Sequence, residues 1–154
     1  MRVVLDTNVL VSANPSARGA AGALLELLGL SPSHRLVLSP YILRETERVL
    51  RYSRMQSLWP LSSGAILEYV RALEASADVV TPFFMTNLVP GDPDDDPVLA
   101  TALTGRADIL CTRDRHFQDA AVVRVCHTAS IRLLTDVELL RCLRAGLDYS
   151  VGEE

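Results

Sequence analysis

The chain has 154 residues, of which 49% are hydrophobic, and its formal net charge is -4 at pH 7. This length suits one compact domain spanning residues 1–154, and the acidic balance argues against a broad basic surface that grips nucleic acid through many phosphate contacts. No basic region followed by a long apolar stretch stands near the N-terminus, so we expect a cytoplasmic protein with neither a signal peptide nor a membrane span.

Short apolar strands and helices alternate along the chain. In chain order we expect a strand at 2–6, a helix at about 18–29, a strand at 36–38, a helix from Ser39 to about Arg54, a helix from Ser62 or Ser63 to about Ala77, a strand at 79–81, a helix from Pro97 to Gly105, a strand at 109–112, a helix at 119–128, a strand at 131–134 and a final helix. Ser39 followed by Pro40 is an N-cap before a residue suited to the first helical position, and Thr135 with Glu138 forms a capping box.

This alternation predicts an α/β fold in which a parallel sheet is covered by helices on both faces. Ligands of such sheets collect outside the carboxyl ends of the strands, which is where Asp6 and Asp114 are expected to lie. Acidic side chains that converge at this edge would form a pocket that only a hard cation can neutralise. The sequence therefore indicates a metal enzyme.

Two of the candidate acids directly follow strands. Asp6 could merely cap the next turn, but Thr7 and Asn8 beside it are neutral hydrogen-bonding residues of the kind that hold a metal-binding carboxylate in place. Asp114 comes two residues after Thr112, so that a hydroxyl and a carboxylate share one rim of the sheet. The alternative for Asp114 is again a helix cap.

Glu45 is the third candidate, and its position on a helix makes it informative. It falls between Ile42 and Val49 at the three-and-four spacing of an inward face. A carboxylate there needs a partner, which is either a cation or an arginine in a buried ion pair. Glu47 lies on the opposite side of the helix, where Arg51 one turn later can pair with it.

The fourth candidate lies in the run from Asp92 to Asp96, which holds more like charges than helix capping explains. Asp96 directly precedes Pro97 and is the natural N-cap, which leaves Asp95 or Asp94 free to point at a metal. Asp92, beside a proline, is most simply a turn residue. Carboxylate oxygens suit Mg²⁺ or Mn²⁺, whereas zinc would want histidine or cysteine.

Histidines and cysteines carry no further signal in this chain. We assign no chemistry to the three histidines, His34, His116 and His127, because they follow no pattern of metal ligation. The cysteines are widely spaced without a C-x-x-C pair, so we expect buried thiols at Cys111, Cys126 and Cys142.

Four motifs in order carry a family resemblance. They are Leu-Asp-Thr-Asn-Val-Leu at 5–10, Ser-Pro-x-x-Leu-x-Glu-x-x-x-Val-Leu at 39–50, Asp-Pro-Asp-Asp-Asp-Pro-Val-Leu-Ala-Thr-Ala at 92–102, and Ala-Asp-Ile-Leu-Cys-Thr-Arg-Asp-x-x-Phe at 107–117. From residue 2 to about 143 the chain resembles a PIN domain, especially the bacterial and archaeal group related to the VapC toxins of toxin–antitoxin systems.

The resemblance implies a three-layer α/β/α sandwich whose acidic pocket binds magnesium or manganese and cuts RNA. It gives the four acidic positions to Asp6, Glu45, Asp95 and Asp114, with Asn8 and Thr112 as supporting polar groups. An alignment slip of one residue would exchange Asp95 for Asp96. Relatives of this type commonly form homodimers and are inhibited by a small antitoxin protein, so both partners are implied as well.

Three other readings are possible from the sequence. The chain could be a catalytically inactive PIN-like module that binds RNA or protein, although all four acids are present. A haloacid-dehalogenase-like phosphatase needs Asp-x-Asp after the first strand, where this chain has Asn8. A receiver domain needs a lysine, and the chain has none. The aliphatic helix around 20–30 could form a dimer surface, but we favour a core position because one of its faces must pack on the sheet.

Overall fold

The computed structural model of the protein describes residues 1–83 and 86–146. Its strands form one parallel sheet in the order β3-β2-β1-β4-β5. The strands are β1 (Arg2–Leu5), β2 (Arg35–Leu38), β3 (Asp78–Val79), β4 (Ile109–Cys111) and β5 (Arg132–Leu134). In the centre of the sheet, Val4 pairs with Val37 on one side and with Leu110 on the other. The predicted all-parallel sheet is confirmed.

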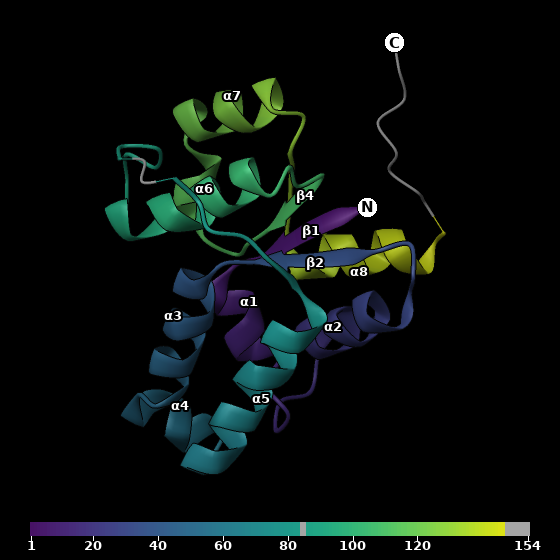
Figure 1. Ribbon diagram of the computed structural model, residues 1–154, viewed down its shortest axis with the longest axis vertical. Helices are drawn as coiled ribbons and strands as arrows, with labels where there is room; N and C mark the ends of the chain where they lie inside the picture. Colours follow the sequence, from purple (N-terminus) through teal and green to yellow (C-terminus); the bar gives the residue numbers. More distant parts are fainter. Residues whose placement is uncertain (84–85, 147–154) are drawn as a thin grey trace.

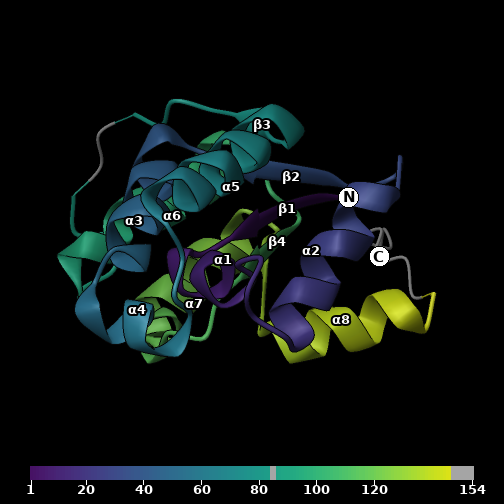
Figure 2. The same cartoon turned by 90° about the horizontal axis from the view of Figure 1, so that it is seen from below.

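Helices cover both faces of this sheet, as Figure 1 shows, with α6 and α7 on one face and α1, α2 and α5 on the other. The described helices are α1 (Thr7–Ser12), α2 (Ala20–Leu30), α3 (Pro40–Leu50), α4 (Ser53–Leu58), α5 (Ser63–Ser76), α6 (Asp96–Thr104), α7 (Ala120–Thr128) and α8 (Asp136–Arg144), with 3-10 turns η1 (Pro93–Asp95) and η2 (Arg115–Gln118). In Figure 2, α2 and α8 lie side by side. The fold is a three-layer α/β sandwich.

The core is built on the central strands, because parallel strands are buried on both faces. Val3, Val4 and Leu5 are completely buried, and so are the residues of β4 from Ile109 to Cys111. The cysteines are free thiols; Cys111 and Cys126 are buried and Cys142 is partly buried. Among the helices of residues 1–83 and 86–146, none is long and apolar enough to cross a lipid bilayer.

The helix predicted to run from Ser39 to about Arg54 is wrong only in its last turn. It ends at Leu50, and a separate helix, α4, begins at Ser53. The chain turns because Tyr52 adopts an extended backbone conformation, with φ -63 and ψ 141. The Arg48 guanidinium donates a hydrogen bond to the Tyr52 hydroxyl and lies over its ring. The sequence around the break contains neither glycine nor proline, so the local pattern did not predict the end of the helix at Leu50.

The aliphatic helix α2 contributes to the core as favoured from its sequence. Ala21, Leu24 and Leu28 are buried. Leu30, at the end of the helix, is 74% exposed. A homodimer therefore does not follow from this helix and stays a prediction of the family resemblance.

Candidate metal centre

The carboxyl ends of β1 and β4 carry Asp6 and Asp114 to one edge of the sheet. The backbone amide of Asp6 donates to the carbonyl of Cys111 at 2.9 Å, which joins the two strand ends. Asp6 caps α1 through its Oδ1 atom, which accepts from the Thr7 amide at 2.6 Å. Only 4% of the residue is exposed. Asp6 therefore caps α1 and also lies buried at the candidate site, so the cap role does not rule out a role in metal binding.

Thr112 connects the two acids through one hydroxyl group. Its Oγ1 donates to Asp6 Oδ2 at 2.6 Å and accepts from the backbone amide of Asp114 at 3.0 Å. Burial raises the pKa of Asp6 to about 6; the hydrogen bonds from Thr112 and Thr7 act in the opposite direction, and the charge of Asp114 adds to the rise. Asp6 is thus a carboxylate held in place by donors but deprived of solvent.

Asp95 is the most strained member of the site in electrostatic terms. Its side chain is 13% exposed, and its Oδ2 atom is buried without a hydrogen-bond partner. Burial, and then the charges of Asp6, Asp114 and Asp92, raise the pKa of Asp95 to about 8. A buried acceptor surrounded by like charges is unfavourable unless a cation joins it.

Asp95 belongs to a compact group of four potential metal ligands. One ligand atom from each of Asp92, Asp95, Asp114 and His116 lies within 4.8 Å of the others. His116 Nδ1 is 3.1 Å from Asp114 Oδ1, 3.7 Å from Asp95 Oδ2 and 3.8 Å from Asp92 Oδ2. We refer to these four residues as the acidic cluster.

His116 and Asp92 are the members of this cluster that sequence reasoning missed. Asp92 does act as the expected turn residue, because its Oδ1 accepts from the Asp94 amide at 3.0 Å, but it also faces His116. The His116 ring packs on Gly91, where a Cβ atom would lie only 2.7 Å from the ring's Cδ2. The available signal was the position of His116 two residues after a strand-end aspartate.

The other two aspartates of the run have structural contacts. Asp96 was expected to be the N-cap of its helix, and this is wrong: Asp95 occupies that position, and Asp96 is the first helical residue. The Asp96 side chain is buried and accepts from the Val89 amide at 2.7 Å, which fixes the loop before the acidic cluster. Asp94 accepts from the Tyr41 hydroxyl through its backbone carbonyl at 3.0 Å.

Glu45 lies outside the acidic cluster. Its carboxylate accepts two hydrogen bonds from Arg48, at 2.9 Å from Nε and 2.7 Å from Nη2, and its side chain is 22% exposed. It is nevertheless near the site, since burial and then the charges of Glu45, Asp94 and Asp95 raise the pKa of Tyr41 to about 12. The predicted pair of Glu47 with Arg51 is confirmed at 3.1 Å.

Asn8, predicted to support Asp6, follows it by two residues in α1. Its Oδ1 atom is buried and has no hydrogen-bond partner among the described residues. This atom and Asp95 Oδ2 are two unsatisfied oxygen acceptors in the segments that carry the candidate site. Carboxylate and amide oxygens form the donor set that Mg²⁺ or Mn²⁺ prefers, so the residues present fit a hard divalent cation.

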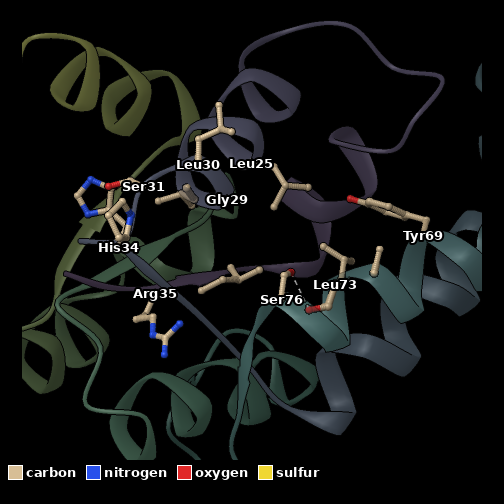
Figure 3. A pocket seen from close by; sticks show the side chains of 13 residues that line it. Leu25, Gly29, Leu30, Ser31, His34, Arg35, Tyr69, Leu73 and Ser76 are labelled. Atoms are coloured by element: carbon tan, nitrogen blue, oxygen red, sulfur yellow. Dashed lines mark hydrogen bonds between the residues drawn. The ribbon is translucent and has the colours of Figure 1, made fainter.

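A different cavity, of about 540 Å³, lies near the start of β2, away from these acids. Figure 3 shows Leu25 and Leu30 from α2 on one side of it, Leu73 and Ser76 from α5 on another, and Arg35 at the strand. None of its lining residues is a carboxylate. The cavity is therefore separate from the candidate metal centre.

The comparison with protein families agrees with this geometry. A family model described as PIN domain matches residues 2–116, which include Asp6, Glu45, the 92–96 run, Asp114 and His116. The chain belongs to the PIN domain family, whose members are generally nucleases. No curated protein matches the chain. The match ends before α7, so the last strand and helix, included in the resemblance seen in the sequence, lie beyond it.

Proposed function

We propose that the protein is an endoribonuclease that depends on Mg²⁺ or Mn²⁺ and hydrolyses RNA phosphodiester bonds with water as the nucleophile. The observation that carries the proposal is the buried, unpartnered Oδ2 of Asp95 beside the carboxylates of Asp6 and Asp114. Such a cluster is costly in the folded protein unless it serves to hold a cation.

In this proposal Asp6, Asp95 and Asp114 hold the cation, with Asp92 and His116 at the rim. A divalent cation bound there would supply Lewis-acid chemistry to the phosphodiester and to the attacking water. The Thr112 hydroxyl holds Asp6 and the backbone of Asp114 in one arrangement. Because these contacts exist before any substrate arrives, the carboxylates need little reorganisation during the reaction.

Glu45 remains the proposed fourth acid, and the energy of its ion pair decides whether that is reasonable. Arg48 is 59% exposed and lies three residues away on the same helix. Ion pairs of this kind contribute only about 0.3–0.5 kcal/mol. The attraction between a carboxylate and a divalent cation is stronger than this ion pair. Glu45 can therefore leave Arg48 to bind the cation.

We further propose that the nuclease is the toxin of a toxin–antitoxin pair, that a small antitoxin protein inhibits it, and that it acts as a homodimer in the cytoplasm. These finer assignments rest on the resemblance of its motifs to the VapC group. Co-purification of a small partner with the chain would support the antitoxin. Isolation of an active nuclease from its native host without such a partner would argue for a solitary enzyme.

The central test compares Asp6→Asn with the wild type in an RNA cleavage assay containing magnesium. We expect the variant to be slower by a factor of about 100–1000, since it loses one charged oxygen of the site. Asp94→Asn is the matched control, because Asp94 lies in the same acidic run but outside the acidic cluster. If Asp6→Asn and the wild type cleave RNA equally, and chelator abolishes both activities, the assignment of Asp6 to the metal site is wrong.

Metal binding provides a second readout that does not depend on turnover. Titration of Mn²⁺ in a calorimeter should show weaker binding for Asp6→Asn, and also for Glu45→Gln if that side chain leaves Arg48. RNA binding without cleavage by a metal-loaded wild type would instead favour the inactive PIN-like module. The same experiments therefore separate the two readings.

A further inference from the structure

A cleft of about 450 Å³ opens beside the acidic cluster, between the first turns of α3, the start of α6 and the segment that follows β3. The helices α3 and α6 that form two of its walls contact one another and are drawn in Figure 1. The residues that matter for the argument are Tyr41, Arg44, Pro82, Phe83, Pro93 and Pro97. The volume lies within the range of pockets that bury a small ligand or one nucleotide.

The cleft shares a wall with the candidate metal centre. Pro93 and Asp96 line it, and these residues flank Asp94 and Asp95 in the chain. Tyr41, also in the lining, donates its hydroxyl hydrogen to the Asp94 carbonyl. The cleft therefore borders the segment of chain that carries Asp95.

One cation in the cleft is not committed to any acid. Along α3, Arg48 pairs with Glu45 and Arg51 pairs with Glu47. Arg44 is exposed, lines the cleft and makes no ion pair with the residues of 1–83 and 86–146. A free guanidinium beside a carboxylate cluster is a fitting contact for a phosphate of an anionic chain.

Most of the other lining residues are prolines, alanine and aromatic residues, beside Thr81, Thr86 and Asp96, and they include an exposed aromatic ring. Phe83 is 79% exposed. Large apolar side chains left in solvent at a cleft often mark a binding surface. Proteins that bind single-stranded nucleic acid combine cationic side chains with aromatic rings on which the bases stack.

We propose that this cleft holds one nucleobase of single-stranded RNA next to the bond that is cut, with the base stacked on Phe83 and the adjoining phosphate on Arg44. The proposal rests on the proposed nuclease function and specifies its substrate as unpaired RNA. It also assigns binding to residues outside the acidic cluster. Removal of either side chain should therefore weaken RNA binding without removing the metal.

The test measures binding of a fluorescent ten-nucleotide single-stranded RNA in magnesium, in an Asp6→Asn background that keeps the RNA intact. Phe83→Ala should raise the Kd about ten-fold, the loss expected of one stacked base. Leu58→Ala is the control, because Leu58 is 58% exposed on α4 and outside the cleft. An oligonucleotide without bases should bind equally well to the protein that keeps Phe83 and to Phe83→Ala, because it has no base to stack on the ring.

Arg44→Gln tests the phosphate contact by its salt dependence. We expect the slope of log K against log salt to become shallower by about 0.7, the value for one phosphate of a single strand. Arg71→Gln, on the exposed face of α5, is the control and should keep the wild-type slope. Circular dichroism should show both variants folded, and Mn²⁺ titration of the same two substitutions in the chain that keeps Asp6 should show metal binding like that of the wild type.

Two negative outcomes are distinguishable. If Phe83→Ala and Arg44→Gln bind RNA like their controls while Asp6→Asn abolishes cleavage, the cleft proposal is overturned and the nuclease stands. If the folded, metal-loaded wild type neither binds nor cleaves RNA, both proposals fall.

Discussion

At the amino edge of the sheet, where β1, β3 and β4 begin, Arg2 donates hydrogen bonds to the nearby carboxylates. At the carboxyl edge, one carboxylate oxygen of Asp95 is buried without any hydrogen-bond donor among the described residues. Arg2 pairs with Asp78 at 2.8 Å and donates from Nε to the Gly105 carbonyl at 2.7 Å. The Arg2 amide donates to Asp108 at 2.6 Å. Aspartate thus aligns the strands at the amino edge, while at the carboxyl edge it forms the candidate metal site.

The difference between the edges lies in what each carboxylate lacks. Asp78 has a cationic partner and keeps access to solvent, so that its charge costs little. The Oδ2 atom of Asp95 is buried among like charges without a hydrogen-bond partner. Substitution of Asp78 at the amino edge should therefore affect stability alone, while substitution of Asp95 at the carboxyl edge should lower activity and raise stability.

The largest effect should come from Asp95→Asn. We expect RNA cleavage to fall by a factor of about 100–1000, because a charged oxygen of the site is lost. In chelator, the same variant should melt at a higher temperature than the wild type, since the neutral amide relieves the repulsion with Asp6 and Asp114. Cleavage rates and thermal melts in chelator measure the two effects. A variant that loses both activity and stability would contradict the comparison.

The pH dependence of stability should show the same repulsion without mutation. The pKa values of Asp6 and Asp95, about 6 and 8, lie above the ordinary value of an aspartate, 3.8, so between pH 4 and 8 the folded state binds more protons than the unfolded state. These groups therefore lower the unfolding free energy as pH rises, by on the order of 3 kcal/mol. Urea unfolding in chelator from pH 5.5 to 8.5 measures this contribution. The decline should be shallower for Asp95→Asn and when Mg²⁺ is added.

A paired acid at the carboxyl edge gives a third comparison. Asp136, which is 1% exposed, accepts hydrogen bonds from Arg113, and this partner lowers its pKa. Arg113→Gln should cost about 2 kcal/mol at neutral pH, because it leaves a buried charge unpaired. The contribution of Asp136 is present above its unfolded pKa and is lost as pH falls through the lower folded value. Urea unfolding of Arg113→Gln with and without Asp136→Asn would show the coupling, and additive losses would disprove it.

The smallest effect is expected at the amino edge. Asp78→Asn removes an ion pair whose side chains are 35% and 38% exposed, so we expect a loss of about 0.5 kcal/mol. Cleavage of RNA should not change. A fall in activity with Asp78→Asn would show that the two edges are not independent.

The sequence predicted the features of this protein that depend on local pattern. The alternation of apolar strands and helices predicted the parallel sheet. Of the two caps predicted for α5, Ser62 or Ser63, the structure has Ser62, and the predicted capping box of Thr135 is confirmed. It also placed Asp6 and Asp114 at one edge, because parallel strands bring their carboxyl ends together. The PIN domain match agrees with these assignments of family and fold.

The contacts that sequence reasoning missed are made between segments that only folding brings together. Asp96 accepts from Val89, seven residues earlier, because the intervening loop folds back, and no capping rule describes that bond. His116 meets Asp92 and Asp95 across a gap of more than twenty residues. The spacing of Glu45 on its helix predicted an inward position, but did not reveal that Arg48 would reach its carboxylate first.

The contact between Gly91 and His116 makes the acidic cluster sensitive to a residue that carries no chemistry. A single methyl group at position 91 would overlap the imidazole ring, so the ring would have to swing outward or the loop that carries Asp92 and Asp95 would have to retreat. Either displacement opens the cluster while every carboxylate is kept. Position 91 is thus a point at which a methyl group alone would change the geometry of the acidic cluster.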